Sequence, residues 1–563
     1  MTASLHSTRP RGATPIAGAA VDWRLRYAAL AVAVSLASCG GGGGTETPVP
    51  SPPGGGGGGN VSVSGKVTFD SVPPQSPRGL NYGGITRAPI RGATIQLIDA
   101  SGAVVGSTVS NALGDYTLSG NASGQVSVRV LAELKGTNYN FTVRDNTDGG
   151  AMWGMQSSSF AAGAGVTQDV HATSGWNGTS YTASQRVAGP FAILDIAYLA
   201  KEKITSVAPT QDFASLKIFW SSNNVPSGGN LRDGAIGTSF FITGLPSTDP
   251  DAAALGISPS DRSLFILGAE NVDTDEYDTA VIAHEIGHYL QSVISRDDSV
   301  GGPHGPDDLL DMRVAFSEGW GNAWSGMVRD NPVYFDSQGA RQASGFQYSV
   351  ATAPATQGWY SEGTVEYLLW NYYSDTRIAF GGIYAALADM SDSPYLSSIF
   401  SFNEALRVAR PSVATTINSS AVAAGVNGTD GYGTGETNSG SITGVLPVYE
   451  EHNVSLGAAT THCVTREAGS PNKLGNFVYV KFTASGVRTV SVQRSANTVQ
   501  RTDPDLKVIT SQGQTFQSRA ETDNTDSIPN LSLTAGTHVL VIDDYFLRDS
   551  GATGQRCFDV RIN

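Results

Sequence analysis

The stretches His284-Glu285-Ile286-Gly287-His288 and Ser317-Glu318-Gly319-Trp320-Gly321-Asn322 hold the residues that decide the fold of this 563-residue chain. In an α-helix, residues four apart lie about 40° apart around the axis. The imidazoles of His284 and His288 therefore project from one helix face, where they can bind one Zn²⁺ ion. The first stretch predicts a metal-binding helix.

The second stretch supplies the remaining donor of this predicted site. Catalytic zinc usually takes three protein ligands and leaves its fourth position to water. Glu318, thirty residues after His288, is the predicted third ligand. Glu285 lies beside the first histidine without being a ligand, so we predict that it takes a proton from water and later passes it to the leaving amine.

The flanking sequence predicts a helix packed beside a sheet. Asp273 is the predicted N-cap, and Asp275 and Glu276 favour the positive end of the helix. The apolar run Val281-Ile282-Ala283 buries the helix, and Ser263-Leu264-Phe265-Ile266-Leu267 is a predicted strand. This order is expected beside a cleft at a sheet edge, where a peptide substrate can dock as an added strand.

Residues 281–375 resemble the gluzincin clan of zinc peptidases and, within it, the fungalysin-type endopeptidases. In that family the zinc helix carries His-Glu-x-x-His, and the next helix carries Gly-Glu-Gly-Trp-Ser-Asp, which this chain matches at Glu318, Gly319 and Trp320. Glu366-Tyr367-Leu368-Leu369-Trp370-Asn371 resembles the following helix of the family, which contains a Leu-Trp pair. The resemblance implies an α+β zincin-like domain with endopeptidase activity.

One position departs from the family pattern. Four residues after the third ligand, where the family has Asp, this chain has Asn322, on the same helix face as Glu318. The family Asp supports a ligand histidine, and Asn can accept an imidazole N–H through its carbonyl oxygen, but without negative charge. We therefore predict that Asn322 supports a ligand histidine. The alternative is that it faces solvent or packs against the helix.

Other residues are weaker candidates. His304 lies in the loop between the two predicted ligand helices, and we expect an ordinary loop histidine there, although it could also face the cleft. Tyr289, Tyr360 and Tyr367 are candidate donors to the tetrahedral oxyanion, and the sequence does not choose among them.

The loop after His304 is acidic. Asp307, Asp308 and Asp311 offer the oxygen atoms that Ca²⁺ prefers. A solvated acidic loop is the interpretation that the sequence favours over a calcium site.

The amino-terminal residues indicate export. Arg24 and Arg26 precede the apolar run from 27 to 37, which is too short to span a bilayer and has the form of a signal-peptide core. Leu36-Ala37-Ser38-Cys39 resembles the bacterial lipobox, in which the leader is removed before the cysteine and its thiol is acylated. The absence of Asp at position 40 resembles signals for transport to the outer membrane or cell surface. The alternative is ordinary secretory cleavage with a chance cysteine.

Composition agrees with an extracytoplasmic protein. Apart from Cys39 the chain has two cysteines, Cys463 and Cys557, and we predict a disulfide between them, with two free buried thiols as the alternative. The formal net charge is −15, and removal of residues 1–38, which carry four Arg and one Asp, changes it by −3 to −18. Nucleic acid is therefore an unexpected partner.

Two β-rich regions flank the predicted peptidase region. The first region contains Gly114-Asp115-Tyr116 and resembles carboxypeptidase regulatory-like modules. The second region contains Asp503-Pro504-Asp505-Leu506 and residues 533–540, which resemble the bacterial pre-peptidase C-terminal domain. The alternating patterns that predict strands lie at 61–69, 93–99, 114–118, 125–131, 216–220, 239–242, 477–482, 489–493, 506–509 and 538–542. Helices are predicted at 190–204 and around 365–372.

The predicted organisation is multidomain. It comprises a lipoprotein signal peptide (1–38), a Gly/Pro-rich tether (39–59), a β-sandwich (60–145), an α+β zinc metallopeptidase domain (150–445) and a C-terminal β-sandwich (447–563). The predicted function is zinc-dependent endopeptidase action on extracytoplasmic proteins or peptides, by a chain attached to the membrane through lipid on Cys39. The alternative is a catalytically silent surface-binding or adhesive lipoprotein on the same scaffold.

Overall fold

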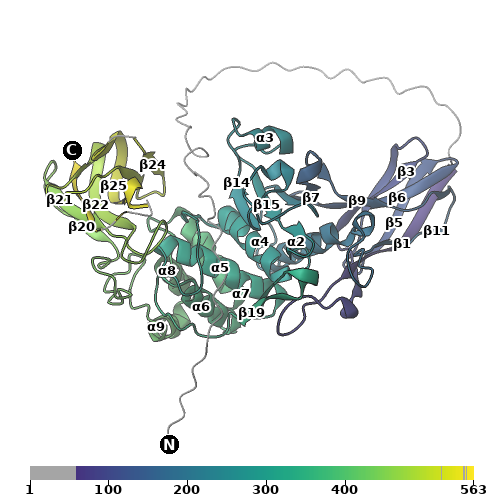
Figure 1. The fold of residues 1–563 in the computed structure, drawn as a ribbon, viewed down its shortest axis with the longest axis horizontal. Helices are drawn as coiled ribbons and strands as arrows, with labels where there is room; N and C mark the ends of the chain where they lie inside the picture. The colour runs from purple at the N-terminus through teal and green to yellow at the C-terminus, as the bar shows by residue number, and fades with distance from the viewer. Residues whose placement is uncertain (1–58, 521–522, 549–551, 553) are drawn as a thin grey trace, which may run out of the picture.

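The computed structural model describes residues 59–520, 523–548, 552 and 554–563. The predicted signal peptide, most of the tether and the predicted lipid site Cys39 lie outside the described residues. In Figure 1, a β-rich part at the N-terminal end lies to the right, a second β-rich part at the C-terminal end lies to the left, and helices lie between them.

A five-stranded sheet is built around the first described strand. β1 (Gly59–Ser71) runs antiparallel to β2 (Thr86–Pro89) and β5 (Asp115–Ala122), and parallel to β11 (Val166–Thr167) and β12 (Val170–Ala172). The predicted alternation of β1 points its apolar side chains inward. The buried residues include Val61, Val63, Val67 and Phe69.

A ten-stranded sheet continues from the N-terminal part into the central part. Its order is β14-β15-β13-β7-β6-β3-β4, and β8, β9 and β10 pair beside this path. Their bounds are β3 (Ala93–Asp99), β4 (Val104–Val109), β6 (Gln125–Lys135), β7 (Asn140–Asp145), β8 (Ala151–Met152), β9 (Gly154–Gln156), β10 (Phe160–Ala161), β13 (Leu216–Trp220), β14 (Phe240–Thr243) and β15 (Arg262–Ile266). Because β7 pairs with β13, the sheet crosses the domain boundary that we expected near residue 150.

One edge strand of this sheet is β14. It runs antiparallel to β15, whereas β7, β13 and β15 are mutually parallel. β14 is the last strand of the sheet on this side, so within the described chain its outer edge has no paired strand. The predicted strand at 263–267 is therefore one strand in from the edge.

Eight α-helices occur in the described residues, most of them packed together below the sheet in the view of Figure 1. Their bounds are α2 (Ala188–Thr205), α3 (Pro250–Leu255), α4 (Thr279–Ile294), α5 (Met312–Arg329), α6 (Glu362–Ser374), α7 (Ala379–Asp389), α8 (Ile399–Ala409) and α9 (Ala414–Ala423). The helices predicted at 190–204 and around 365–372 are confirmed as α2 and α6.

The start of α4 differs from the prediction. Its N-cap is Asp278, whereas the predicted N-cap Asp273 lies in a short strand, β17 (Asp273–Thr274). The Asp278 carboxylate accepts hydrogen bonds from the backbone N–H and the hydroxyl of Ser337. The Asp278 side chain therefore makes a tertiary contact and does not cap a backbone N–H of α4. The small sheet around it contains β16 (Gly268–Ala269), β17, β18 (Val333–Gln338) and β19 (Ser344–Ser349).

The C-terminal part is a seven-stranded sheet around a core of its own. The order is β21-β26-β22-β25-β23-β24, with β20 beside β22. The bounds are β20 (Glu450–His452), β21 (Ala459–Val464), β22 (Phe477–Arg494), β23 (Pro504–Ile509), β24 (Thr515–Ser518), β25 (Thr525–Asp544) and β26 (Arg556–Ile562). The strands predicted at 477–482 and 489–493 form one long strand, β22, whose pairing with β25 shifts register near Gly486.

The disulfide prediction is confirmed. Cys463 and Cys557 are directly opposite each other on β21 and β26 and are joined by a disulfide bond. The mixed α and β, multidomain character is also as predicted. No helix in the described part of the chain is long and apolar enough to cross a bilayer.

Candidate metal centre

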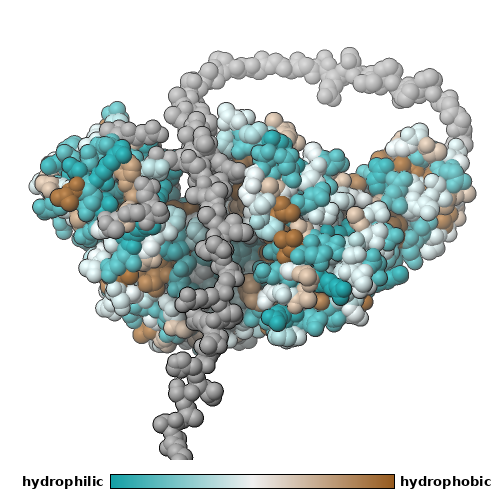
Figure 2. All heavy atoms as spheres, viewed as in Figure 1, coloured by the Kyte–Doolittle hydropathy of each residue, from teal (hydrophilic) through white to brown (hydrophobic). Residues whose placement is uncertain are grey.

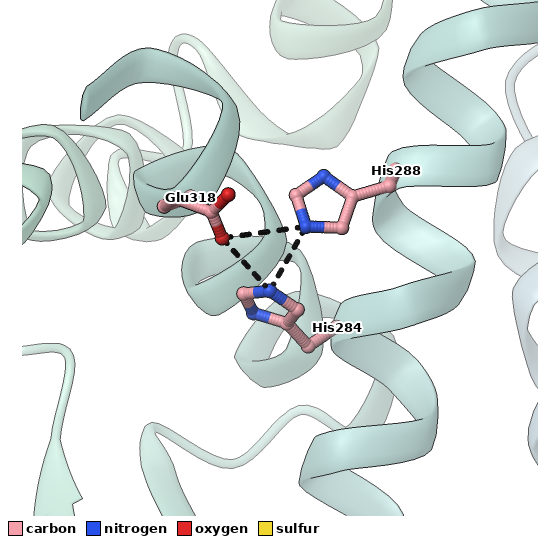
Figure 3. Close-up of side chains that lie close together, drawn as sticks. All are labelled: His284, His288 and Glu318. Atoms are coloured by element: carbon pink, nitrogen blue, oxygen red, sulfur yellow. Dashed lines mark hydrogen bonds and ion pairs between the residues drawn. The ribbon is translucent and has the colours of Figure 1, made fainter. Parts of the chain in front are cut away.

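Three predicted ligands converge between two facing helices. His284 and His288 project from α4 toward Glu318 on α5 (Figure 3). Glu318 Oε2 lies 3.3 Å from His284 Nε2 and 3.4 Å from His288 Nε2, and the two Nε2 atoms are 3.0 Å apart. Tetrahedral bonds of about 2.0–2.1 Å give ligand atoms roughly 3.3 Å apart, so the three side chains fit Zn²⁺.

Glycines allow α4 and α5 to approach this closely. A Cβ atom on Gly321 would lie 2.8 Å from the His284 ring, and one on Gly287 would lie 3.1 Å from the Gly321 Cα atom. Trp320 then donates from its indole N–H to the Gly287 carbonyl at 2.8 Å. The Gly-Trp-Gly sequence after Glu318 is therefore what brings the third donor within reach of the histidines.

Both histidines are held through their outer nitrogen atoms. His284 Nδ1 lies 2.8 Å from Asn322 Oδ1, an acceptor, so Nδ1 carries the hydrogen. His288 Nδ1 lies 3.1 Å from the Ser317 hydroxyl, which itself donates to Gln291 at 3.0 Å. Each Nε2 lone pair is thereby directed at the common point between the ligands. The sequence had not singled out Ser317, although it directly precedes Glu318.

A buried carboxyl group lies behind Asn322. Asn322 hydrogen-bonds Glu366 on α6, which also accepts a hydrogen bond of 3.0 Å from the Tyr348 hydroxyl. Burial raises the pKa of Glu366 to about 8, although these two hydrogen bonds oppose the shift. Glu366 therefore carries a proton at neutral pH in the metal-free protein.

Glu285 is placed beside the ligands and at the cleft. It is 7% exposed and lines the same cavity as His284, His288 and Glu318. Burial raises the pKa of Glu285, and the neighbouring His284 and His288 oppose that shift. A raised pKa suits a carboxylate that has to hold a proton briefly.

His304 is not the ordinary loop histidine that we expected. Its Nε2 lies 3.3 Å from Glu318 Oε2, and its Nδ1 lies 2.7 Å from Glu362 Oε2 at the start of α6. Burial lowers its pKa, but Glu362 and Glu318 together raise it to about 9. The feature of the sequence that could have pointed to His304 was its place in the loop between the ligand helices. We found no feature of the sequence that pointed to Glu362.

None of the three predicted tyrosines lines the cleft. Tyr289 donates to the Ala214 carbonyl within the core, Tyr360 donates to Asn438 at 2.8 Å, and Tyr367 is half-buried on α6. The tyrosines that do line the cleft include Tyr334, whose ring centroid is 6.2 Å from that of His284.

The aspartates suggested for Ca²⁺ do not converge in the described structure. Asp311 caps α5 and pairs with Arg313 at 2.8 Å, whereas Asp308 pairs with Lys473 at 3.2 Å. The described residues contain one other group of three possible ligands besides His284, His288 and Glu318. It consists of Asp273, Asp275 and Asp336, whose oxygen atoms lie within 4.8 Å of one another.

The candidate metal centre opens into a cleft of about 2430 Å³. Strand β14 and residues 299–307 line it, and the C-terminal part contributes Lys507 and Tyr545. This volume exceeds the roughly 300–1,000 Å³ of a typical small-ligand pocket. Elsewhere on the face seen in Figure 2, hydrophobic residues form small separate patches among hydrophilic ones.

The chain matches no protein-family model and no curated protein. Among solved structures, it is similar to the pre-peptidase C-terminal domain of a Bacillus anthracis collagenase, with 8% identity over 20% of this chain and 94% of that one and a TM-score of 0.14. It is also similar to Aeromonas hydrophila PliG, a periplasmic inhibitor of g-type lysozyme, with 10% identity over 20% and 96% of the chains and a TM-score of 0.15. These scores are too low to carry a functional argument, which therefore rests on the site.

Proposed function

We propose that this protein is a zinc-dependent endopeptidase. The observation that carries the proposal is the convergence of His284 Nε2, His288 Nε2 and Glu318 Oε2, with Glu285 beside them at the cleft. A fold that only needed to bind metal would not need an acid–base group beside the ligands. Zn²⁺ held there would supply Lewis acidity and make water a stronger acid.

The residues of the chain account for the proton transfers. Glu285 takes a proton from the attacking water while the water oxygen bonds to the carbonyl carbon and the C=O π electrons move to oxygen. When the intermediate collapses, the electron pair on the oxygen re-forms the C=O bond, the C–N bonding pair goes to nitrogen, and Glu285 returns the proton to the leaving amine. Asn322 and Ser317 keep His284 and His288 in the orientation that the metal requires.

The edge strand supports a peptide as the substrate. β14 lines the cleft, and the main-chain groups on its outer edge can pair with an extended segment. Such pairing binds the substrate backbone, with the scissile bond over the ligand triangle. Binding through the backbone in a long cleft suits cleavage within a polypeptide.

We further propose that the protein acts outside the cytoplasm as a lipid-anchored enzyme. The sequence Leu36-Ala37-Ser38-Cys39 motivates the anchor, and the Cys463–Cys557 disulfide favours an oxidising compartment. The mature charge of −18, derived above as −15 − 3, makes nucleic acid an unexpected substrate.

A second candidate function is a catalytically silent binding protein on the same scaffold. Asn322 favours it, because the uncharged amide gives less support to a ligand histidine than the family carboxylate. Glu285 argues against it, since binding alone does not require that residue.

The test combines metal analysis with cleavage of unfolded casein, with and without chelator. We expect about one zinc per chain and chelator-sensitive cleavage. Glu285→Gln should retain zinc and lose turnover by several orders of magnitude. Glu202→Gln, an exposed change on α2, is the matched control and should behave like the parent. A parent that binds zinc but never cleaves would favour the silent function, and cleavage by Glu285→Gln at the parental rate would remove Glu285 from the mechanism.

A further inference from the structure

We infer that His304 is a further catalytic residue, which donates a hydrogen bond from Nε2 to the substrate carbonyl oxygen as that oxygen becomes negatively charged. The inference rests on the proposed peptidase function and adds a residue to its site. It also gives the C-terminal part a role, since Asn472 and Lys473 of that part hydrogen-bond the loop that contains His304.

The first step is the orientation of the imidazole. The Glu362 carboxylate lies 2.7 Å from His304 Nδ1, so it accepts the Nδ1 hydrogen and fixes the ring plane. Glu362 is 7% exposed at the first position of α6, so it is largely buried beside the His304 ring. The opposite nitrogen, Nε2, therefore faces the ligand cluster and lies 3.3 Å from Glu318 Oε2.

The second step separates His304 from the ligands. The donor atoms of His284, His288 and Glu318 all lie within 4.8 Å of one another, and His304 is not a member of that group. The carboxylate among the three ligands, Glu318, is within ion-pairing distance of His304. His304 thus lies just outside the ligand triangle while lining the cleft, where a substrate carbonyl beside the triangle would be within its reach.

The third step is the support of the loop. His304 follows two glycines with positive φ, Gly301 at 58° and Gly302 at 99°. Asn472 of the C-terminal part donates to the Gly301 carbonyl at 2.8 Å, and Lys473 donates to the Pro303 carbonyl at 2.6 Å. Both hydrogen bonds act within three residues of His304, so a loop that glycine would leave mobile is held in one conformation.

The fourth step is chemical. Addition of water to the carbonyl carbon converts a neutral oxygen into one that carries negative charge, and amine departure converts it back. A donor placed at that oxygen stabilises the transition state more than the bound substrate. His304 keeps its own hydrogen throughout, so the proton balance of Glu285 is unchanged.

The experiment compares His304→Ala and His304→Gln, which retains an N–H donor, with the full-length parent. His171→Ala is the matched control, because His171 also pairs with a carboxylate, Asp70 at 3.0 Å, but lies in the N-terminal sheet and does not line the cleft. Three quantities are measured: zinc affinity of the metal-free proteins, kcat and KM for one peptide, and inhibition by a phosphinic peptide and by a thiol peptide. The phosphinic group carries the tetrahedral anionic oxygen, and the thiol does not.

For His304→Ala we expect a fall in kcat of about 10²–10³, the usual effect of losing one such donor, with little change in KM. The phosphinic peptide should weaken by a similar factor, while zinc affinity and thiol inhibition stay near parental values. His304→Gln should recover part of the loss, and His171→Ala should match the parent.

Several outcomes would overturn the inference. Parental kcat in His304→Ala would mean that the ring does not act on the substrate. A large loss of zinc affinity would show that His304 supports Glu318 instead, and an equal loss of both inhibitors would indicate general disruption. If the loss appears in Tyr334→Phe and not in His304→Ala, the donor is Tyr334. Failure of the parent to bind zinc or cleave any peptide would remove the proposed function, and the inference with it.

Discussion

Replacement of Asn322 tests the candidate metal centre through the residue that hydrogen-bonds His284. Asn322 Oδ1 accepts the Nδ1 hydrogen of His284 at 2.8 Å, and the same amide hydrogen-bonds Glu366. In Asn322→Leu the buried Nδ1–H loses its partner. We expect zinc affinity to fall roughly ten- to a hundredfold, equivalent to about 1.4–2.7 kcal/mol.

Asn322→Asp should have the opposite effect, within a limited pH range. A carboxylate makes the His284 imidazole a stronger ligand, so zinc should bind as tightly as in the parent or more tightly. The protonated Glu366, whose pKa burial raises to about 8, can donate its hydrogen to the new carboxylate. As the pH rises past about 8, Glu366 loses that proton, and repulsion between the two carboxylates should reduce the gain.

The assay is competition for zinc between each metal-free protein and a chromophoric chelator, at pH 7 and pH 9. Asn403→Leu is the control, because Asn403 is also buried and accepts a hydrogen bond of 3.1 Å from Tyr372, but on α8. It should lower the melting temperature without changing zinc affinity. Indistinguishable affinities for the Asn, Asp and Leu forms would refute the support of His284 by residue 322.

Three further predictions concern the rest of the chain. Cys39→Ser should abolish lipid labelling and either release the protein from membranes or leave the leader uncut; unchanged labelling would show that another group is the anchor. Cys463 and Cys557 are 94 residues apart, so reduction of their disulfide should lower the free energy of unfolding by about 4–5 kcal/mol in the chain-entropy estimate. Reductant should therefore lower the denaturation midpoint of the parent, and it should not change the midpoint of the Cys463→Ser/Cys557→Ser variant. Lys473→Met should lower kcat with unchanged zinc affinity, because the loop before His304 loses a contact, whereas Lys481→Met, on the following strand β22, should not; equal kcat values for the two variants would contradict this.

The helix repeat was sufficient to predict the element that carries the two predicted histidine ligands. The spacing of His284 and His288 depends only on the helix repeat, and α4 does contain both residues. Its first residue was not predicted, because Asp273 lies in strand β17 and pairs with Gln338 of β18. Local sequence shows which residues can cap a helix, but it does not show which of them a distant strand will pair with.

Long-range strand pairing was the second feature beyond local prediction. The strand pattern predicted β13 but not β7, and the parallel pairing of these two strands joins Phe141 to Leu216 across helix α2. That pairing merges the expected N-terminal β-sandwich with the central part, so one sheet presents β14 to the cleft. Strand propensity alone does not determine which distant strand becomes a neighbour.

We predicted His304 to be an ordinary loop histidine, because the residues around it gave no other indication. A histidine among glycines and prolines has the composition of a solvent-exposed turn. Its partners, Glu362 and Lys473 through Pro303, lie on elements that only the tertiary fold brings together.

The C-terminal part also reaches the helix that carries Glu318. Asp311, the N-cap of α5, accepts a hydrogen bond from the Tyr479 hydroxyl, and the Arg313 guanidinium lies 4.4 Å from the Phe477 ring centroid. Burial lowers the pKa of Arg313, but Asp311 and Tyr479 outweigh it and hold that pKa above its usual value, so the charge is retained. A buried, charged pair at the start of α5 is stable only while its cover is in place. The C-terminal sheet supplies that cover as well as the support of the His304 loop, so the position of Glu318 and that of His304 both depend on it.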